Sequence, residues 1–167
     1  YIAWAPEKKL NIKILKQSAG FTLDGATSSK RLLTLERNNL TNNLWFTREY
    51  FTGVLASGEI AETWSYKASF FSSDGDEEWG LDGASWFTFW SLGYRWMNTQ
   101  LNLAYVYQDE HEEAGTRPFE QILSLTAKWK KGSWGVWGDL TAGKGFSAQE
   151  QSDVWGFVAM PFYDFTD

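Results

Sequence analysis

The sequence predicts an all-β chain folded as a transmembrane antiparallel meander, the arrangement of an outer-membrane β-barrel wall. Three observations favour this class. Nine stretches alternate apolar and polar residues, as strands with one apolar face do. The links between them alternate between short and long, so the short links would all lie at one end of the sheet and the long links at the other, as in outer-membrane barrels. Aromatic residues make up 18% of the chain, yet its mean hydropathy is only −0.40, because alternate residues alone would face lipid.

The expected strands, in order, occupy residues 1–6, 10–15, 46–58, 63–71, 85–96, 100–108, 121–130, 133–142 and 153–163. Short links join them at Pro6–Lys9, Glu59–Glu62, Met97–Thr99 and Lys131–Gly132. Long polar links lie at 16–45, 72–84, 109–120 and 143–152. Each strand should therefore run antiparallel to the next, with short turns at one end of the sheet and long loops at the other. Residues 1–167 are expected to be part of a single domain.

The stretch 85–96 shows most clearly the two faces expected of each strand. Its apolar parity carries Trp86, Trp90 and Trp96, whereas its other parity includes Ser91 and Arg95. The stretches 63–71, 100–108 and 121–130 repeat this pattern. A soluble β-sandwich also alternates in this way. Sorted loops, strands near the ~9–11 residues of a tilted span and the excess of Trp at strand ends favour the barrel.

Basic residues recur on the polar parity near the short turns, at Lys13, Lys67, Arg95 and Lys128. We expect them at similar height around a water-filled lumen, opposed among inward strand positions only by Asp139. Rings of Lys and Arg select anions in pores. The alternative is that any aqueous lumen carries charges and that these four share a sign by chance.

The sequence offers no pattern typical of catalysis or metal binding. There is no Cys, and the single histidine, His111, lies in an acidic loop, where solvation is the expected state. No G-x-S-x-G occurs, and Asp139 has no inward acidic partner. We predict no enzyme activity, no cofactor and no metal. The acidic loops are expected to be solvated, with divalent-cation bridging to lipid headgroups as an alternative.

The connection 16–45 is long enough to fold into the lumen as a constriction. Its run TSSKRLLTLERNNL, at 27–40, resembles the T-S-S-x-x-L-T-F-x-E-R-S-L segment of the phosphate-selective porin O and P family. Arg48, Thr52, Gly53 and Val54 match the R-x-x-x-T-G-V strand that follows it there. The acidic loop SSDGDEEWG and the closing strand VWGFVAMPFYDFTD are also similar. The chain departs from the pattern at three positions, Leu15 in place of Gly, Leu35 in place of an aromatic residue, and Asn38 in place of Ser.

The resemblance implies a 16-stranded, homotrimeric barrel in the outer membrane of a Gram-negative-type bacterium. This chain would supply about nine strands, as a mature or internal segment, because residue 1 already lies in an expected strand. The function implied is passive diffusion of phosphate and other small inorganic anions. Arg31 and Arg37 would meet the anion, with Glu36 as a counter-charge. Outer-membrane lipid is the other expected partner, and nucleic acid is not expected.

Two alternatives remain at this stage. One is a small eight-stranded barrel with a filled interior that anchors without conducting. Nine strands and the long connection count against it. The other is a soluble carbohydrate-binding β-domain that uses surface Trp. It would place Trp in loops, whereas most Trp residues here fall within the expected strands.

Overall fold

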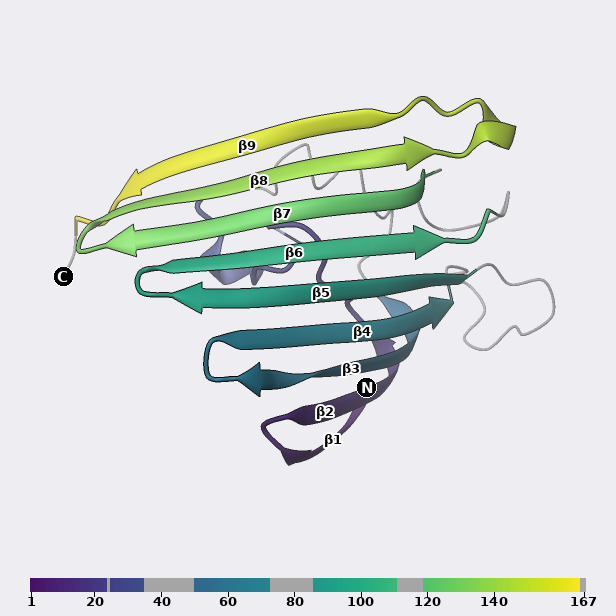
Figure 1. The fold of residues 1–167 in the computed structure, drawn as a ribbon, viewed down its shortest axis with the longest axis horizontal. Coiled ribbons are helices and arrows are strands. Elements are labelled where there is room, and N and C mark those ends of the chain that lie inside the picture. Colours follow the sequence, from purple (N-terminus) through teal and green to yellow (C-terminus); the bar gives the residue numbers. More distant parts are fainter. Residues whose placement is uncertain (24, 35–49, 73–85, 111–118, 166–167) are drawn as a thin grey trace.

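The computed structural model describes residues 1–23, 25–34, 50–72, 86–110 and 119–165. These residues form one nine-stranded antiparallel sheet in which every strand pairs with its neighbours in sequence (Figure 1). The strands are β1 (Ile2–Glu7), β2 (Leu10–Gln17), β3 (Phe51–Ala61), β4 (Trp64–Ser72), β5 (Trp86–Trp96), β6 (Thr99–Gln108), β7 (Phe119–Lys131), β8 (Trp134–Gly145) and β9 (Val154–Tyr163). The predicted all-β meander is confirmed. Within the described residues β1 and β9 do not pair, so the sheet is open.

The third strand differs from its predicted bounds of 46–58. Residues 46–49 lie outside the described residues, Tyr50 is not in a strand, and β3 continues to Ala61. The added residues pair with the start of β4, through Glu59 with Ser65 and Ala61 with Trp64. The apolar alternation of the third strand ends at residue 58, but β3 continues to Ala61 because its last residues pair with β4.

The connections are sorted by end as predicted. The four short links are two residues each, at 8–9, 62–63, 97–98 and 132–133, and they lie at the left in Figure 1. Met97 (φ 49°) and Gly132 (φ 58°) open two of them in the left-handed region. Two-residue hairpins need such positive φ values to match the right-handed twist of their strands. The long links all leave the opposite end.

Helical structure is confined to two short 3-10 turns, η1 (Ser29–Arg31) and η2 (Ser147–Gln149), within the described ranges. No helix in this part of the chain has the length and apolar character to cross a membrane.

The chain after β2 covers one face of the sheet. We call residues 18–34 the inner segment and the face beneath them the inner face. In Figure 1 this segment passes behind β5 to β8. Ala19, Phe21 and Leu23 on the segment are almost fully buried. Phe21 packs edge-on against Phe89, with ring centroids 6.0 Å apart. The buried core lies between the inner segment and the long-loop half of the inner face, and includes Phe51, Phe71, Phe87, Phe89, Val106, Phe119 and Ile122.

The opposite face, here the outer face, is apolar, and no other segment among the described residues covers it. One row runs straight across five strands, because Leu92 pairs with Leu103, Leu103 with Leu125, Leu125 with Leu140, and Leu140 with Phe157. These side chains are 41% to 69% exposed. Aromatic residues flank the row toward both strand ends, among them Trp96, Trp129 and Trp134 near the short turns and Phe70, Trp86 and Tyr107 near the long loops. Alternation has thus produced a sheet that is packed on its inner face and apolar without cover on its outer face.

Candidate functional site

Two adjoining cavities lie on the inner face beside the inner segment. The first, of about 330 Å³, is lined by Lys67, Arg95 and Lys128, together with neutral polar residues that include Ser65, Ser91, Gln100, Asn102 and Thr126. The second, of about 470 Å³, is lined by Lys13 and Lys67. Gly20, Ala26 and Lys67 line both. The four strand-borne cations predicted to face inward therefore gather around two adjoining cavities that share part of their lining.

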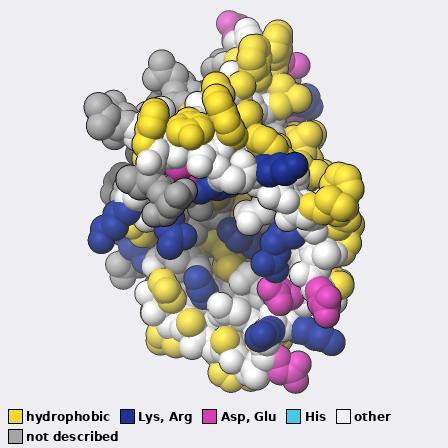
Figure 2. Space-filling model, turned by 90° about the vertical axis from the view of Figure 1, so that its left-hand side faces the viewer, with side chains coloured by type: hydrophobic (Ala, Val, Ile, Leu, Met, Phe, Trp, Pro, Cys, Tyr) yellow, Lys and Arg dark blue, Asp and Glu magenta, His cyan; other side chains and the backbone are white. Residues whose placement is uncertain are grey.

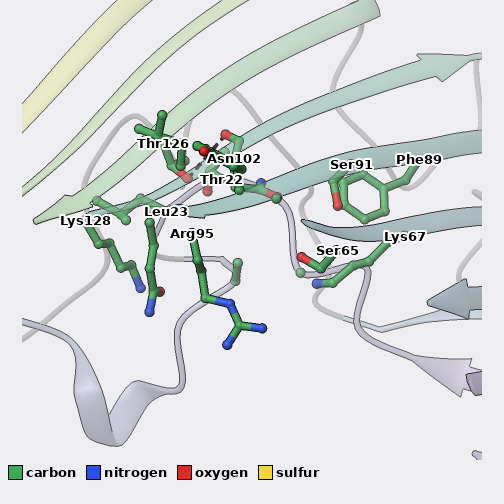
Figure 3. A pocket seen from close by; sticks show the side chains of 16 residues that line it. Thr22, Leu23, Ser65, Lys67, Phe89, Ser91, Arg95, Asn102, Thr126 and Lys128 are labelled. Carbon is green, nitrogen blue, oxygen red and sulfur yellow. Dashed lines mark hydrogen bonds between the residues drawn. The ribbon is translucent and has the colours of Figure 1, made fainter. Parts of the chain in front are cut away.

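Strand parity explains why these side chains share a face. Lys67 falls on the same parity of β4 as Ser69, and Arg95 on the same parity of β5 as Phe89, and both Ser69 and Phe89 are buried on the inner face. Figure 3 shows Lys67, Arg95 and Lys128 extending from the same side of the sheet. Seen from the short-turn end, Lys and Arg side chains gather in a central hollow, with hydrophobic side chains along its upper and right margins (Figure 2).

The four cations do not all lie in one row of paired residues. Arg95 pairs with Gln100, and Gln100 with Lys128, so Arg95 and Lys128 share one row. Lys67 pairs with Ser91, four residues from Arg95 along β5, or about 13 Å at ~3.3 Å per residue. Lys13 pairs with Leu55, which pairs with Ser69, two residues beyond Lys67. Relative to the strand pairing, Lys67 and Lys13 are therefore offset from the row of Arg95 and Lys128. All four still lie within four residues of a short turn, and their similar height around a lumen stays a prediction, because the strands of a barrel are tilted.

Three of the ammonium groups rest on aromatic rings. The Nζ of Lys13 is 4.8 Å from the centroid of Tyr1, that of Lys67 is 6.0 Å from Phe89, and that of Lys128 is 4.1 Å from Trp137. A ring face attracts a cation through its quadrupole and leaves its charge in place. The rings therefore orient the lysines without neutralising them.

Arg95 has an acidic partner that the sequence-based prediction missed. Its Nη2 lies 3.0 Å from Oε1 of Glu59, with the two side chains 53% and 45% exposed. Glu59 was assigned to a turn, because the third strand was expected to end at residue 58. The sequence does predict that 46–58 and 63–71 form a hairpin. Continuing their pairing toward the turn would have placed Glu59 in the third strand. Such an exposed pair is weak and screened by salt.

No Asp or Glu is among the described residues that line either cavity. Asp139, which was expected to oppose the cations, lies on the inner face but is only 3% exposed and lines neither cavity. Its Oδ1 accepts hydrogen bonds from Ser124 Oγ and Thr141 Oγ1, each at 2.9 Å, and its Oδ2 accepts one from the backbone N–H of Leu23 at 2.8 Å. The charged residues that line the two cavities are thus all basic within the described part of the chain.

The predicted residues on the long connection have a different outcome. Arg31 is exposed at the end of η1 and is not among the residues lining either cavity. Arg37 and Glu36 lie outside the described residues, as do His111 and the acidic loop 73–85. In the described ranges, no three His, Cys, Asp or Glu side chains group closely enough to hold a metal ion.

Cations beside hydroxyl and amide groups favour reversible binding of a hydrated anion. Lys and Arg attract its charge, and Ser, Thr, Asn and Gln replace part of its hydration shell. Comparison with protein-family models, curated proteins and solved structures gives no match to this chain. The functional argument therefore comes from the sheet and these cavities.

Proposed function

We propose that this chain forms part of the wall of an outer-membrane porin, a passive diffusion channel that prefers small anions of the phosphate type. The observation that supports this most directly is the set of four cations from four different strands, which line two adjoining cavities without an acidic residue among the described lining. Pores that prefer anions are lined by cations in this way.

The outer face supports a lipid environment. Soluble monomers rarely expose a contiguous apolar patch larger than a few hundred Å². Here an apolar row crosses five strands and carries Leu103 and Leu125 at 45% and 46% exposure. Trp86 and Trp96, the outer-face aromatic residues at the two ends of β5, are ten residues apart, or about 33 Å along the strand. A strand tilted by about 40° would project this length onto about 25 Å, the height of the apolar band of membrane barrels. Lipid would cover this row without desolvating a polar side chain, because its five residues are all apolar.

The open edges support a larger barrel. Among the described residues β1 pairs only with β2 and β9 only with β8, so each of these strands has one edge without a partner. In lipid, such edges would leave backbone N–H and C=O groups unsatisfied, so we infer that further strands close the wall. A 16-stranded, trimeric barrel of the phosphate-selective porin O and P family satisfies this requirement. Leu15, at the position where that family commonly has Gly, adopts a φ of 78°, the left-handed region that Gly tolerates best.

The mechanism follows from the spacing of the cations. At physiological salt the Debye length is about 8 Å, so each charge acts mainly on its own stretch of the wall. An anion would move from the cavity of Lys13 and Lys67 to that of Lys67, Arg95 and Lys128 without leaving a positive field. Arg95 can bind two phosphate oxygens at once through its planar fork. Arg31 and Arg37 would act at other points of the path.

Charge reversal tests this function. Lys67→Glu with Arg95→Glu should move the reversal potential under a salt gradient from anion-preferring toward cation-preferring in planar bilayers. The matched control is Lys8→Glu with Lys131→Glu, which changes net charge equally but alters exposed residues outside the lining. An unchanged reversal potential, or an equal shift in the control, would contradict the proposal.

A further inference from the structure

The strongest unexplained feature of the inner face is the carboxylate of Asp139. It is 3% exposed, and the structure places no cation within ion-pair distance of it among the described residues. A buried charge is costly unless its oxygens are hydrogen-bonded. Ser124 and Thr141, both fully buried, satisfy Oδ1 from the wall itself. The remaining oxygen, Oδ2, binds the inner segment at Leu23.

The bonded part of the inner segment is a compact turn, here called the turn 22–27, whose described residues are 22, 23 and 25–27. The N–H of Ala26 donates to the carbonyl of Thr22 at 3.0 Å, and the N–H of Gly25 donates to Thr22 Oγ1 at 3.3 Å. The hydroxyl of Thr27 donates to the carbonyl of Leu23 at 2.5 Å. These internal bonds tie the turn together, so it should move as one unit.

The same turn reaches a cation of the first cavity. The Nζ of Lys128 donates to Thr27 Oγ1 at 2.8 Å. A continuous series of hydrogen bonds therefore runs from Asp139 to the N–H of Leu23, and from the carbonyl of Leu23 through the Thr27 hydroxyl to Lys128. Its two ends lie on neighbouring strands, β8 and β7, and its middle lies on a segment more than 100 residues away in sequence.

We propose that Asp139 is a positioning residue that anchors the turn 22–27 to β8 and, through that turn, holds the Lys128 ammonium in place beside the first cavity. This anchoring is separate from the proposed channel function, because it concerns how the inner segment is held against the wall whatever crosses it. It also assigns a role to a buried acid that lines neither cavity.

A single introduced cysteine can report release of the segment, because the chain contains no Cys. Ala19→Cys places a thiol at a position that is 2% exposed in the buried core. In the detergent-solubilised protein, Asp139→Ala should speed the reaction of this thiol with a water-soluble maleimide roughly tenfold or more, because a hydrogen bond to a charged acceptor is lost and the turn opens more often.

Two variants separate the anchor from general damage. When Asp139→Asn is added to the Ala19→Cys protein, the thiol should react with the maleimide at close to the rate seen without it. The Asn carbonyl can accept from the Leu23 N–H, while its amide donates to the Ser124 and Thr141 hydroxyls. Ser124→Ala removes one bond to Oδ1 and leaves Oδ2 on Leu23, so it should also stay near the parent rate. Equal labelling of Asp139→Ala and its parent, or labelling of Asp139→Asn as fast as Asp139→Ala, would overturn the proposal.

The coupling to Lys128 has its own readout, acetylation of that lysine followed by mass spectrometry. Both Asp139→Ala and Thr27→Val should speed Lys128 acetylation, but only Asp139→Ala should expose the thiol introduced at position 19. If Thr27→Val speeds the acetylation of Lys128 and Asp139→Ala does not, the coupling between Asp139 and Lys128 is overturned. If Asp139→Ala does not fold, hydrogen exchange in the unmodified protein decides: rapid exchange of the Leu23 amide would overturn the anchor. None of these measurements needs ion conduction, so their failure is distinct from failure of the channel proposal.

Discussion

Replacement of Leu103 by Arg tests which solvent the outer face meets. Leu103 lies at the middle of β6 (Thr99–Gln108), is 45% exposed, and is flanked by Leu92 and Leu125, which are 41% and 46% exposed. At the midplane of a bilayer, Arg on the lipid face of a barrel costs about 2–4 kcal/mol. On a water-exposed sheet the same change should fall within about 0.5 kcal/mol. The loss in the free energy of unfolding should therefore be several-fold larger if the outer face meets lipid than if it meets water.

The assay is urea unfolding of the protein in lipid vesicles, followed by Trp fluorescence, with the free energy of unfolding extrapolated to water. The matched control is Asn102→Arg on the adjacent residue of the same strand. Asn102 lines the first cavity on the inner face. Arg there can reach the cavity solvent and should cost less than about 1 kcal/mol. Equal costs for Leu103→Arg and Asn102→Arg would refute the assignment of the outer face to lipid.

Two further predictions follow from contacts of the inner face. Glu59→Gln should change the free energy of unfolding by less than about 1 kcal/mol, because the ion pair with Arg95 is exposed. It should increase anion preference in reversal-potential measurements, and a decrease would contradict a role for Arg95 in the anion path. Phe21→Ala should lower the free energy of unfolding by about 3–5 kcal/mol, because it empties a buried site against Phe89. Urea titration measures this loss, and a loss below about 1 kcal/mol would mean that the inner segment is not packed on the wall.

Strand parity in the sequence was enough to predict much of the candidate site. Parity alone assigns Lys13, Lys67, Arg95 and Lys128 to one face, and the structure places all four on the inner face around two adjoining cavities. Parity works because side chains alternate between the two faces of any strand. It does not give relative height, because the stagger of each hairpin depends on pairing. The register places Arg95 and Lys128 in one row and offsets Lys67 and Lys13 from it, which parity alone does not predict.

Parity also could not show which inner positions meet water. Ser124 shares the polar parity with Lys128, and this parity predicts a lumen residue. In the structure Ser124 is 0% exposed and lines neither cavity, because Asp139, which holds the inner segment at Leu23, lies against it. Burial of this kind comes from a segment distant in sequence, and no local pattern records it.

The sequence by itself determined the all-β meander, the sorting of short and long connections, and the two faces of each strand, because each depends on residues adjacent in the chain. Only the tertiary structure decided how far β3 extends, which cations share a row, that Glu59 pairs with Arg95, and that Asp139 binds Leu23. The physical reason is that these features arise from contacts between segments far apart in sequence. Their geometry depends on hairpin register and on where the inner segment packs.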